Sequence, residues 1–135
     1  MIGFSASNLI GSEIYNITGS GQTVIKTVSR GASKTALIVV QNDATVTTSF
    51  GIAGTPGKPG FKVRYYAGET EITAAVLAGT YTIADLPSGQ SVMLKAKVVV
   101  KGGAVPGSKI KCAITATSLA SPTLQDTVKV KIFAR

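Results

Sequence analysis

The chain has 135 residues, 44% of them hydrophobic, and its mean hydropathy is +0.32. This length suits a single domain with a core of its own, and the hydropathy excludes a disordered chain. Fourteen Lys and Arg against six Asp and Glu give a net charge of +8, which favours anionic partners. The absence of His excludes a histidine-based catalytic triad, and the single Cys excludes an intrachain disulfide.

Residues 1–12 are apolar and small and have no strong strand pattern, so we expect them to stand apart from a single domain over residues 13–135. They are either a frayed terminus, an added edge strand, or a donor strand that completes the sheet of a neighbouring copy. The candidate self-assembly residues are Ile2, Phe4, Leu9 and Ile10. No basic region precedes a continuous apolar run, so we expect no signal peptide in this chain. No run approaches the roughly 20 apolar residues that span a bilayer, so the chain is not expected to cross a membrane.

From residue 22 onward the dominant period is two, which predicts strands. The run 34–42 is nearly continuous and rich in branched residues, and the run 91–101 places Val92, Leu94 and their alternate neighbours on one face. The expected strands are 22–29, 34–42, 45–52, 61–66, 72–77, 79–86, 91–101, 108–118 and 126–133. Gly, Pro and Asn turns separate them, and no window shows a sustained helical stripe. The pattern predicts an all-β, antiparallel two-sheet immunoglobulin-like sandwich of about seven to nine strands, without the disulfide of antibody domains.

Basic side chains recur on the outward parity of these strands. They are Lys62, Arg64, Lys95, Lys97, Lys101, Lys109, Lys111, Lys129 and Lys131. One interpretation is that they form the solvated exterior and keep strand edges from pairing. The alternative is a face that binds polyanions through salt-sensitive contacts. Only Tyr66 and Phe133 interleave with them, so the platforms for sequence-specific nucleic-acid recognition are few, and none is expected.

Three other candidate sites are expected to have structural and not catalytic or binding roles. The Gly- and Pro-rich stretch 51–62 lacks the phosphate-binding loop signature and is expected to connect two strands. Cys112 has inward parity and is expected to be a buried small hydrophobe. Glu69 and Glu71 form the one close acidic pair, but nothing around them predicts the cleft that paired carboxylates need for catalysis. We therefore expect no catalytic residue, no cofactor and no metal site.

Four collinear stretches carry a resemblance to a known structural family. They are 9–23, 39–54, 60–98 and 113–130. Together they resemble a β-sandwich repeat module of large secreted bacterial proteins, of the cell-adhesion-related and fibronectin-like type. The resemblance implies an architectural role outside the cell, as a spacer, stalk or adhesion module, and such modules occur in tandem. Thr48 stands where the resemblance leads us to expect an acidic residue, which weakens the case for an ion site at that corner.

The sequence therefore predicts a non-enzymatic structural or adhesion module, extracellular or on the cell surface, with self-assembly into fibres through its N-terminal strand. Its expected partners are other copies of itself or sister domains, and an anionic cell-surface polymer. The alternative function is an electrostatic binding module for anionic polymers, either acidic polysaccharide or nucleic acid, that uses the outward-facing lysines.

Overall fold

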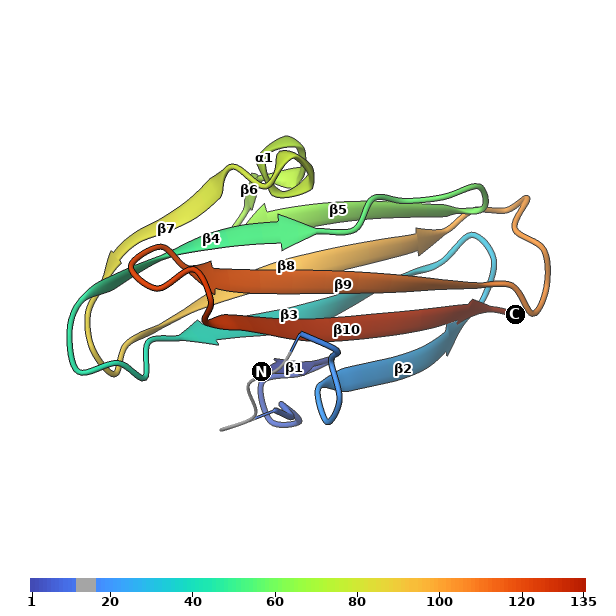
Figure 1. Cartoon of the computed structure of the whole chain (residues 1–135). Coiled ribbons are helices and arrows are strands. Elements are labelled where there is room, and N and C mark those ends of the chain that lie inside the picture. The colour runs from blue at the N-terminus through green and yellow to red at the C-terminus, as the bar shows by residue number, and fades with distance from the viewer. Residues whose placement is uncertain (12–16) are drawn as a thin grey trace.

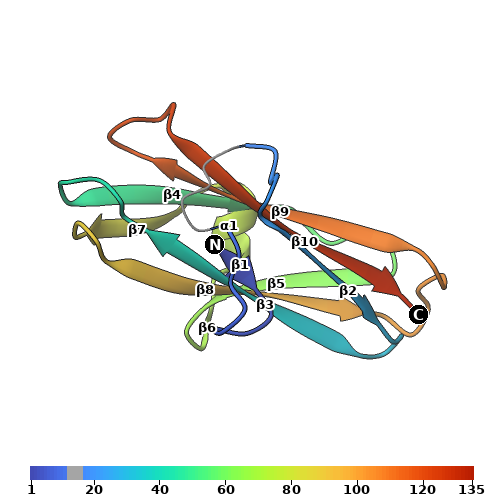
Figure 2. The same ribbon diagram turned by 90° about the horizontal axis from the view of Figure 1, so that it is seen from below.

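The computed structural model describes residues 1–11 and 17–135. In these residues ten strands form two five-stranded sheets that face each other, and there is one helix (Figures 1 and 2). Sheet A has the order β1 (Ile2–Gly3), β3 (Ser33–Gln41), β8 (Ser91–Val100), β5 (Phe61–Ala67), β6 (Thr70–Glu71). Sheet B has the order β2 (Thr23–Val28), β10 (Gln125–Ala134), β9 (Lys109–Ser118), β4 (Thr48–Gly54), β7 (Tyr81–Leu86). The helix, α1, covers Thr73–Ala78.

This architecture confirms the predicted all-β two-sheet sandwich. Eight of the nine expected runs correspond to strands, with ends displaced by up to three residues. The count rises to ten because β1 and β6 are two-residue strands, too short to leave a periodic pattern in the sequence.

The core lies between the two sheets and follows the predicted parity. On β8, Leu94, Ala96, Val98 and Val100 are each at most 3% exposed, and Cys112 on β9 is fully buried. The alternate residues of each strand point away from the core because successive side chains of a strand point to opposite faces. Burying a branched aliphatic or aromatic side chain contributes about 1.5–3 kcal/mol, so these inward rows dominate the stability of the fold.

One strand pair departs from the antiparallel expectation. β2 runs parallel to β10, with Thr23 opposite Lys129 and Val28 opposite Ala134. A parallel pair needs a long crossover, and here most of the sandwich lies between the two strands in the sequence. Alternation of apolar residues carries no information on strand direction, so this parallel pairing could not be predicted from the sequence.

The strand expected at 72–77 is wrong, because these residues form α1. Ala-rich composition favours a helix, and Gly79 ends it with a positive φ of 71° while its N–H donates to Val76 O. Val76 is 1% exposed, and the helix packs against β4, β5 and β7, so it closes one side of the sandwich. Short apolar runs fit a strand and a buried helix equally well.

The N-terminal residues add to the edge of sheet A within their own chain. β1 pairs antiparallel with β3, Ile2 opposite Ile38 and Gly3 opposite Leu37. Ile2 is fully buried, so this part of the terminus is an edge strand and is not frayed. The expected boundary between residues 12 and 13 lies outside the described residues.

Candidate binding surfaces

The predicted basic residues do not form one surface, because the topology divides them between the two outer faces of the sandwich. Sheet A carries Lys62, Arg64, Lys95 and Lys97, with Lys101 just after β8. Sheet B carries Lys109, Lys111, Lys129 and Lys131. Parity along single strands predicts which side chains point outward, but only the pairing of strands decides which of them meet.

On sheet A the basic residues lie next to acidic and apolar side chains. Arg64 lies opposite Lys97, but its Nε also lies 4.0 Å from the Glu71 carboxylate. Lys95 lies between Tyr66 on β5 and Leu37 on β3. This face is a solvated mixture of basic and apolar groups, in which one of the cations has an acidic partner.

On sheet B three lysines gather where β9 begins and β10 ends, and we call Lys109, Lys111 and Lys131 the β9–β10 lysine cluster. Lys111 lies directly opposite Lys131, and Lys109 lies opposite Phe133. The ammonium groups of Lys131 and Lys109 lie 5.4 and 5.9 Å from the centre of the Phe133 ring. The pKa of Lys131 is lowered, first by repulsion from Lys109 and then by burial and by Lys111. Cations this close raise the positive potential of the face.

A groove that was not predicted from the sequence adjoins this cluster. The loop after β4 stays beside β9 through Thr55, whose N–H donates to Ala113 O at 3.1 Å and whose Oγ1 accepts from Ala113 N–H at 3.0 Å. The loop then leaves the sheet and opens a groove of about 380 Å³. Its lining is Thr55, Pro56, Gly57, Lys58, Lys109, Ile110 and Lys111. Lys58 was assigned to a connecting loop, and only the fold brings it beside the cluster.

Lys129 belongs to a different neighbourhood on the same face. It lies opposite Ala113 on one side and Thr23 on the other. Its aliphatic stem packs over Gly19, where a Cβ would come within 2.9 Å of the lysine carbons. The close approach requires glycine at that position.

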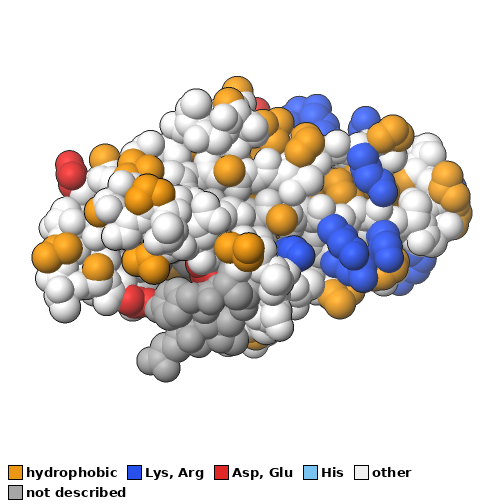
Figure 3. Space-filling model, viewed as in Figure 1, with side chains coloured by type: hydrophobic (Ala, Val, Ile, Leu, Met, Phe, Trp, Pro, Cys, Tyr) orange, Lys and Arg blue, Asp and Glu red, His pale blue; other side chains and the backbone are white. Residues whose placement is uncertain are grey.

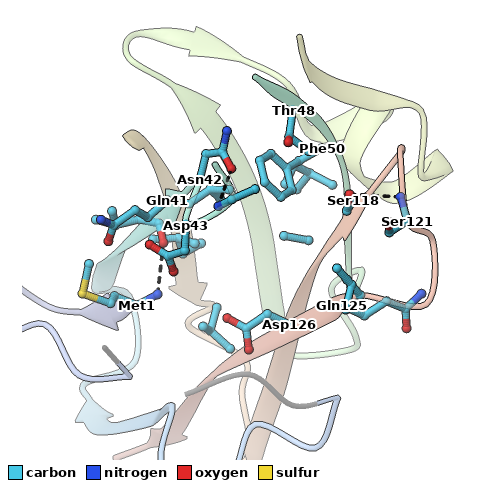
Figure 4. A pocket seen from close by; sticks show the side chains of 18 of the residues that line it. Met1, Gln41, Asn42, Asp43, Thr48, Phe50, Ser118, Ser121, Gln125 and Asp126 are labelled. Atoms are coloured by element: carbon cyan, nitrogen blue, oxygen red, sulfur yellow. Dashed lines mark hydrogen bonds between the residues drawn. The ribbon is translucent and has the colours of Figure 1, made fainter. Parts of the chain in front are cut away.

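A second surface lies at the other end of the sandwich, where a pocket of about 550 Å³ opens between the β3–β4 and β9–β10 loops (Figure 4). Its walls are mostly apolar and include Ile38, Phe50, Ile114, Leu124 and Val128. Leu124 is 65% exposed and Phe50 is half-buried. The pocket is therefore a part of the space between the sheets that solvent reaches.

Two polar groups at the pocket, the Asn42 side chain and the Met1 amine, form hydrogen bonds with backbone carbonyls. Asn42 is fully buried, and its Nδ2 donates to Val46 O at 2.9 Å and to Leu86 O at 2.7 Å. The Met1 amine donates to Val39 O at 3.0 Å. Burial lowers the pKa of that amine, and the nearby carboxylates of Asp126 and Asp43 oppose the shift in part. These hydrogen bonds fix the walls of the pocket.

Of the four candidate self-assembly residues, only Ile2 enters the core. Phe4 is half-buried and lies 5.5 Å from Lys34 Nζ, Leu9 is half-buried, and Ile10 is 39% exposed. Ile2 and Ile10 exchange two backbone hydrogen bonds of 3.0 and 2.9 Å, so the segment folds back on itself. The structure thus brings these residues together at the edge of β3.

The remaining candidate reactive groups are the Cys112 thiol and the carboxylates of Glu69 and Glu71. Burial raises the pKa of the Cys112 thiol to about 12, so the nucleophilic thiolate is disfavoured. Glu69 and Glu71 are both exposed, and Glu71 is the carboxylate beside Arg64. Within residues 1–11 and 17–135 no group of three or more His, Cys, Asp or Glu side chains could hold a metal ion. The same part of the chain contains no helix that is both long and apolar enough to span a membrane.

Neither a protein-family model nor a curated protein matches the sequence. In fold the chain is similar to VesC, a secreted serine protease from Vibrio cholerae, with a TM-score of 0.51 and 12% identity over 82% of this chain and 21% of that one. The periplasmic chaperone SfaE matches with a TM-score of 0.43 and 8% identity over 84% of this chain and 53% of that one. A PapD-like domain of human CEP192 matches with a TM-score of 0.43 and 9% identity over 84% and 80%. In fold the chain is an immunoglobulin-like two-sheet β-sandwich domain, and it spans 21% of the length of VesC.

Proposed function

We propose that this chain is a non-enzymatic structural or adhesion domain that acts outside a bacterial cell and joins copies of itself by exchanging its N-terminal strand. The observation that carries the proposal is β1, a two-residue strand that pairs with only part of a nine-residue neighbour and yet buries Ile2 completely. The segment thus fills an essential place in the core while being held by few backbone contacts.

The edge beside β1 supports an exchange. Val39 and Met1 exchange hydrogen bonds of 2.9 and 3.0 Å, so the odd-numbered residues of β3 face this edge. By the alternation of a strand, Thr35 and Gln41 turn their backbone groups the same way, on either side of the stretch that β1 covers. A sheet edge covered over so short a stretch is a template for an incoming strand.

The N-terminal segment is also simple to transfer. Its hairpin is closed by the two bonds between Ile2 and Ile10 and by one from Asn8 N–H to Ser5 O at 3.1 Å. Gly3 permits this fold, because a Cβ there would come within 2.5 Å of Asn8 O. Removing the segment exposes Ile2, but an identical copy offers identical contacts, so an exchanged strand recovers the same burial and the same pairing with β3.

The setting outside the cell comes from the sequence resemblance to secreted bacterial repeat modules. That resemblance favours a domain that works as one unit among copies or sister domains.

The test is a disulfide that locks β1 onto its own β3. Ile2 and Ile38 form a non-hydrogen-bonded pair with Cα atoms about 4.5 Å apart, which a disulfide can bridge. In a Cys112→Ala background, Ile2→Cys with Ile38→Cys should stay at the mass of one chain when oxidised, over a concentration series measured by light scattering. The unlocked protein should grow in mass, and reduction of the locked variant should restore that growth.

A chain lacking residues 1–10 provides a second measurement, since it has no strand to donate and should lose the growth. If the unlocked full-length chain remains a single chain at every concentration and salt, strand exchange is wrong. If the oxidised lock assembles as well as the reduced form, another surface is responsible.

A further inference from the structure

The β9–β10 lysine cluster places like charges where a sheet normally avoids them. Lys111 and Lys131 are direct cross-strand partners, and like charges in that position destabilise a sheet. Alternate residues along a strand are about 6.8 Å apart and neighbouring strands about 4.8 Å apart, so Lys109 lies within the same small area. Each cation therefore raises the local potential of the other two.

The groove beside the cluster adds a fourth cation and backbone donors. Lys58 lines it together with Lys109 and Lys111. The odd-numbered residues of β9 face β4, as the Ala113–Thr55 bonds show, and β4 pairs with β9 only over residues 114–118. The N–H groups of Lys109 and Lys111 therefore point into the groove, beyond the last paired residue of β4. Ammonium groups and backbone N–H donors that converge on one concavity suit an anion.

Acidic side chains lie elsewhere among the residues that the structure describes. On the opposite sheet, Arg64 lies beside a carboxylate, that of Glu71. Asp43, Asp85 and Asp126 come from the loops and strand ends at the other end of the sandwich. In Figure 3 the blue side chains gather over the half of this face where β9 begins and β10 ends, and the red ones lie elsewhere.

We propose that this groove and the adjoining cluster, comprising Lys58, Lys109, Lys111 and Lys131, bind the sulfate or carboxylate groups of an acidic polysaccharide chain. The site is independent of strand exchange, because it lies at the far end of sheet B from the pocket and uses none of residues 1–10. Lys109, Lys111 and Lys131 come from the larger set that the sequence places on strand exteriors, whereas Lys58 comes from the loop between β4 and β5 and was not predicted.

A polysaccharide fits better than a nucleic acid because the cluster has no free aromatic platform. Single-stranded nucleic acids bind without sequence preference by stacking bases on aromatic faces along a basic groove. The ammonium groups of Lys131 and Lys109 already lie over the ring of Phe133, and Phe61, beneath Lys58, is 1% exposed. Tyr66 lies on the opposite sheet. The groups left for a ligand are charges and N–H donors.

The experiment measures binding of heparin, a sulfated polysaccharide, as a function of salt. Lys111→Gln with Lys131→Gln should weaken binding about tenfold at low salt and reduce the slope of log K against log salt by about two, as expected when two ionic contacts are lost. Lys95→Gln with Lys97→Gln on sheet A is the matched control, because it removes the same charge from outward positions of another strand. The control should keep most of the affinity and the slope.

Lys58→Gln tests the groove separately, and should weaken binding by severalfold although Lys58 is outside the sheet. Circular dichroism checks that each variant is folded. Equal losses in the two double variants would overturn the proposal, because binding would then follow net charge alone. Failure of the wild type to bind heparin would also overturn it, and so would tighter binding of a single-stranded oligonucleotide of matched charge, which would make the ligand a nucleic acid.

Discussion

The two ends of the sandwich differ in how completely their side chains fill the space between the sheets. At the end where β8 and β10 finish and β9 begins, Val98, Val100, Ile110 and Ile132 are each at most 2% exposed. At the other end the pocket of about 550 Å³ separates apolar side chains such as Phe50 and Leu124. We call these the packed end and the open end. One sandwich thus combines a tightly filled core at one end with a pocket between the sheets at the other.

The ends also differ in charge, and strand direction explains why. β10 carries Asp126 near its start at the open end, then Lys129 and Lys131, and Arg135 follows it at the packed end. β9 runs the other way and starts with Lys109 and Lys111 at the packed end. Basic residues thus collect over the end of the sandwich whose core side chains are buried most completely.

The largest difference between the ends should appear in the free energy of unfolding lost when an apolar side chain is truncated to alanine. Ile132→Ala at the packed end should lower the free energy of unfolding by about 2–5 kcal/mol, because it removes fully buried methyl groups and leaves a cavity. Phe50→Ala at the open end should cost only about 1–1.5 kcal/mol, although the side chain is larger, because Phe50 is already half-exposed beside the pocket. Urea denaturation measures both. Equal losses would mean that the ends are packed alike.

A smaller difference in stability between a core position and the pocket should follow when an alanine is enlarged. Ala96 is fully buried at the centre of β8, and Ala96→Leu should destabilise the fold by about 1–3 kcal/mol because the core has no room for it. Ala116 lines the pocket, so Ala116→Leu should be nearly neutral or stabilising. Thermal melts of the two variants provide the comparison, and a clear loss at Ala116 would mean that the pocket is not available to side chains.

The packing of the strands was largely predictable, because alternation reports burial residue by residue. The inward row of β8 and the inward position of Cys112 follow from parity alone. The helix α1 was not predictable, since its six residues contain an apolar run that also suits a strand. The parallel pairing of β2 with β10 was equally hidden, because parity is the same for either direction.

The candidate sites were predictable only as sets of residues. The sequence showed nine outward cations, but which of them meet depends on strand order and register, and these bring Lys111 to Lys131 while placing Lys95 on the far sheet. Lys58 and Asn42 were missed for a related reason. Each lies in or beside a loop, where no periodic pattern marks a residue, and each acquires its role from a partner distant in the chain.

The smallest effect should come from removing one charge of the cluster. Lys131→Gln should raise Tm by roughly 1–2 °C at neutral pH and low salt, because it relieves repulsion from Lys109 and Lys111. The pKa of Lys131 is lowered in the folded state, so the penalty is complete below that pKa and disappears as the pH rises toward the ordinary lysine value of about 10.4. The gain in Tm should therefore shrink at alkaline pH, and it should also shrink in high salt, where the repulsion is screened. Lys95→Gln, whose cross-strand neighbours are Tyr66 and Leu37, should show no such gain. If both variants gain equally, the repulsion belongs to the net charge of the molecule; if only Lys131→Gln gains, it is local to the packed end, where a bound anion would relieve it.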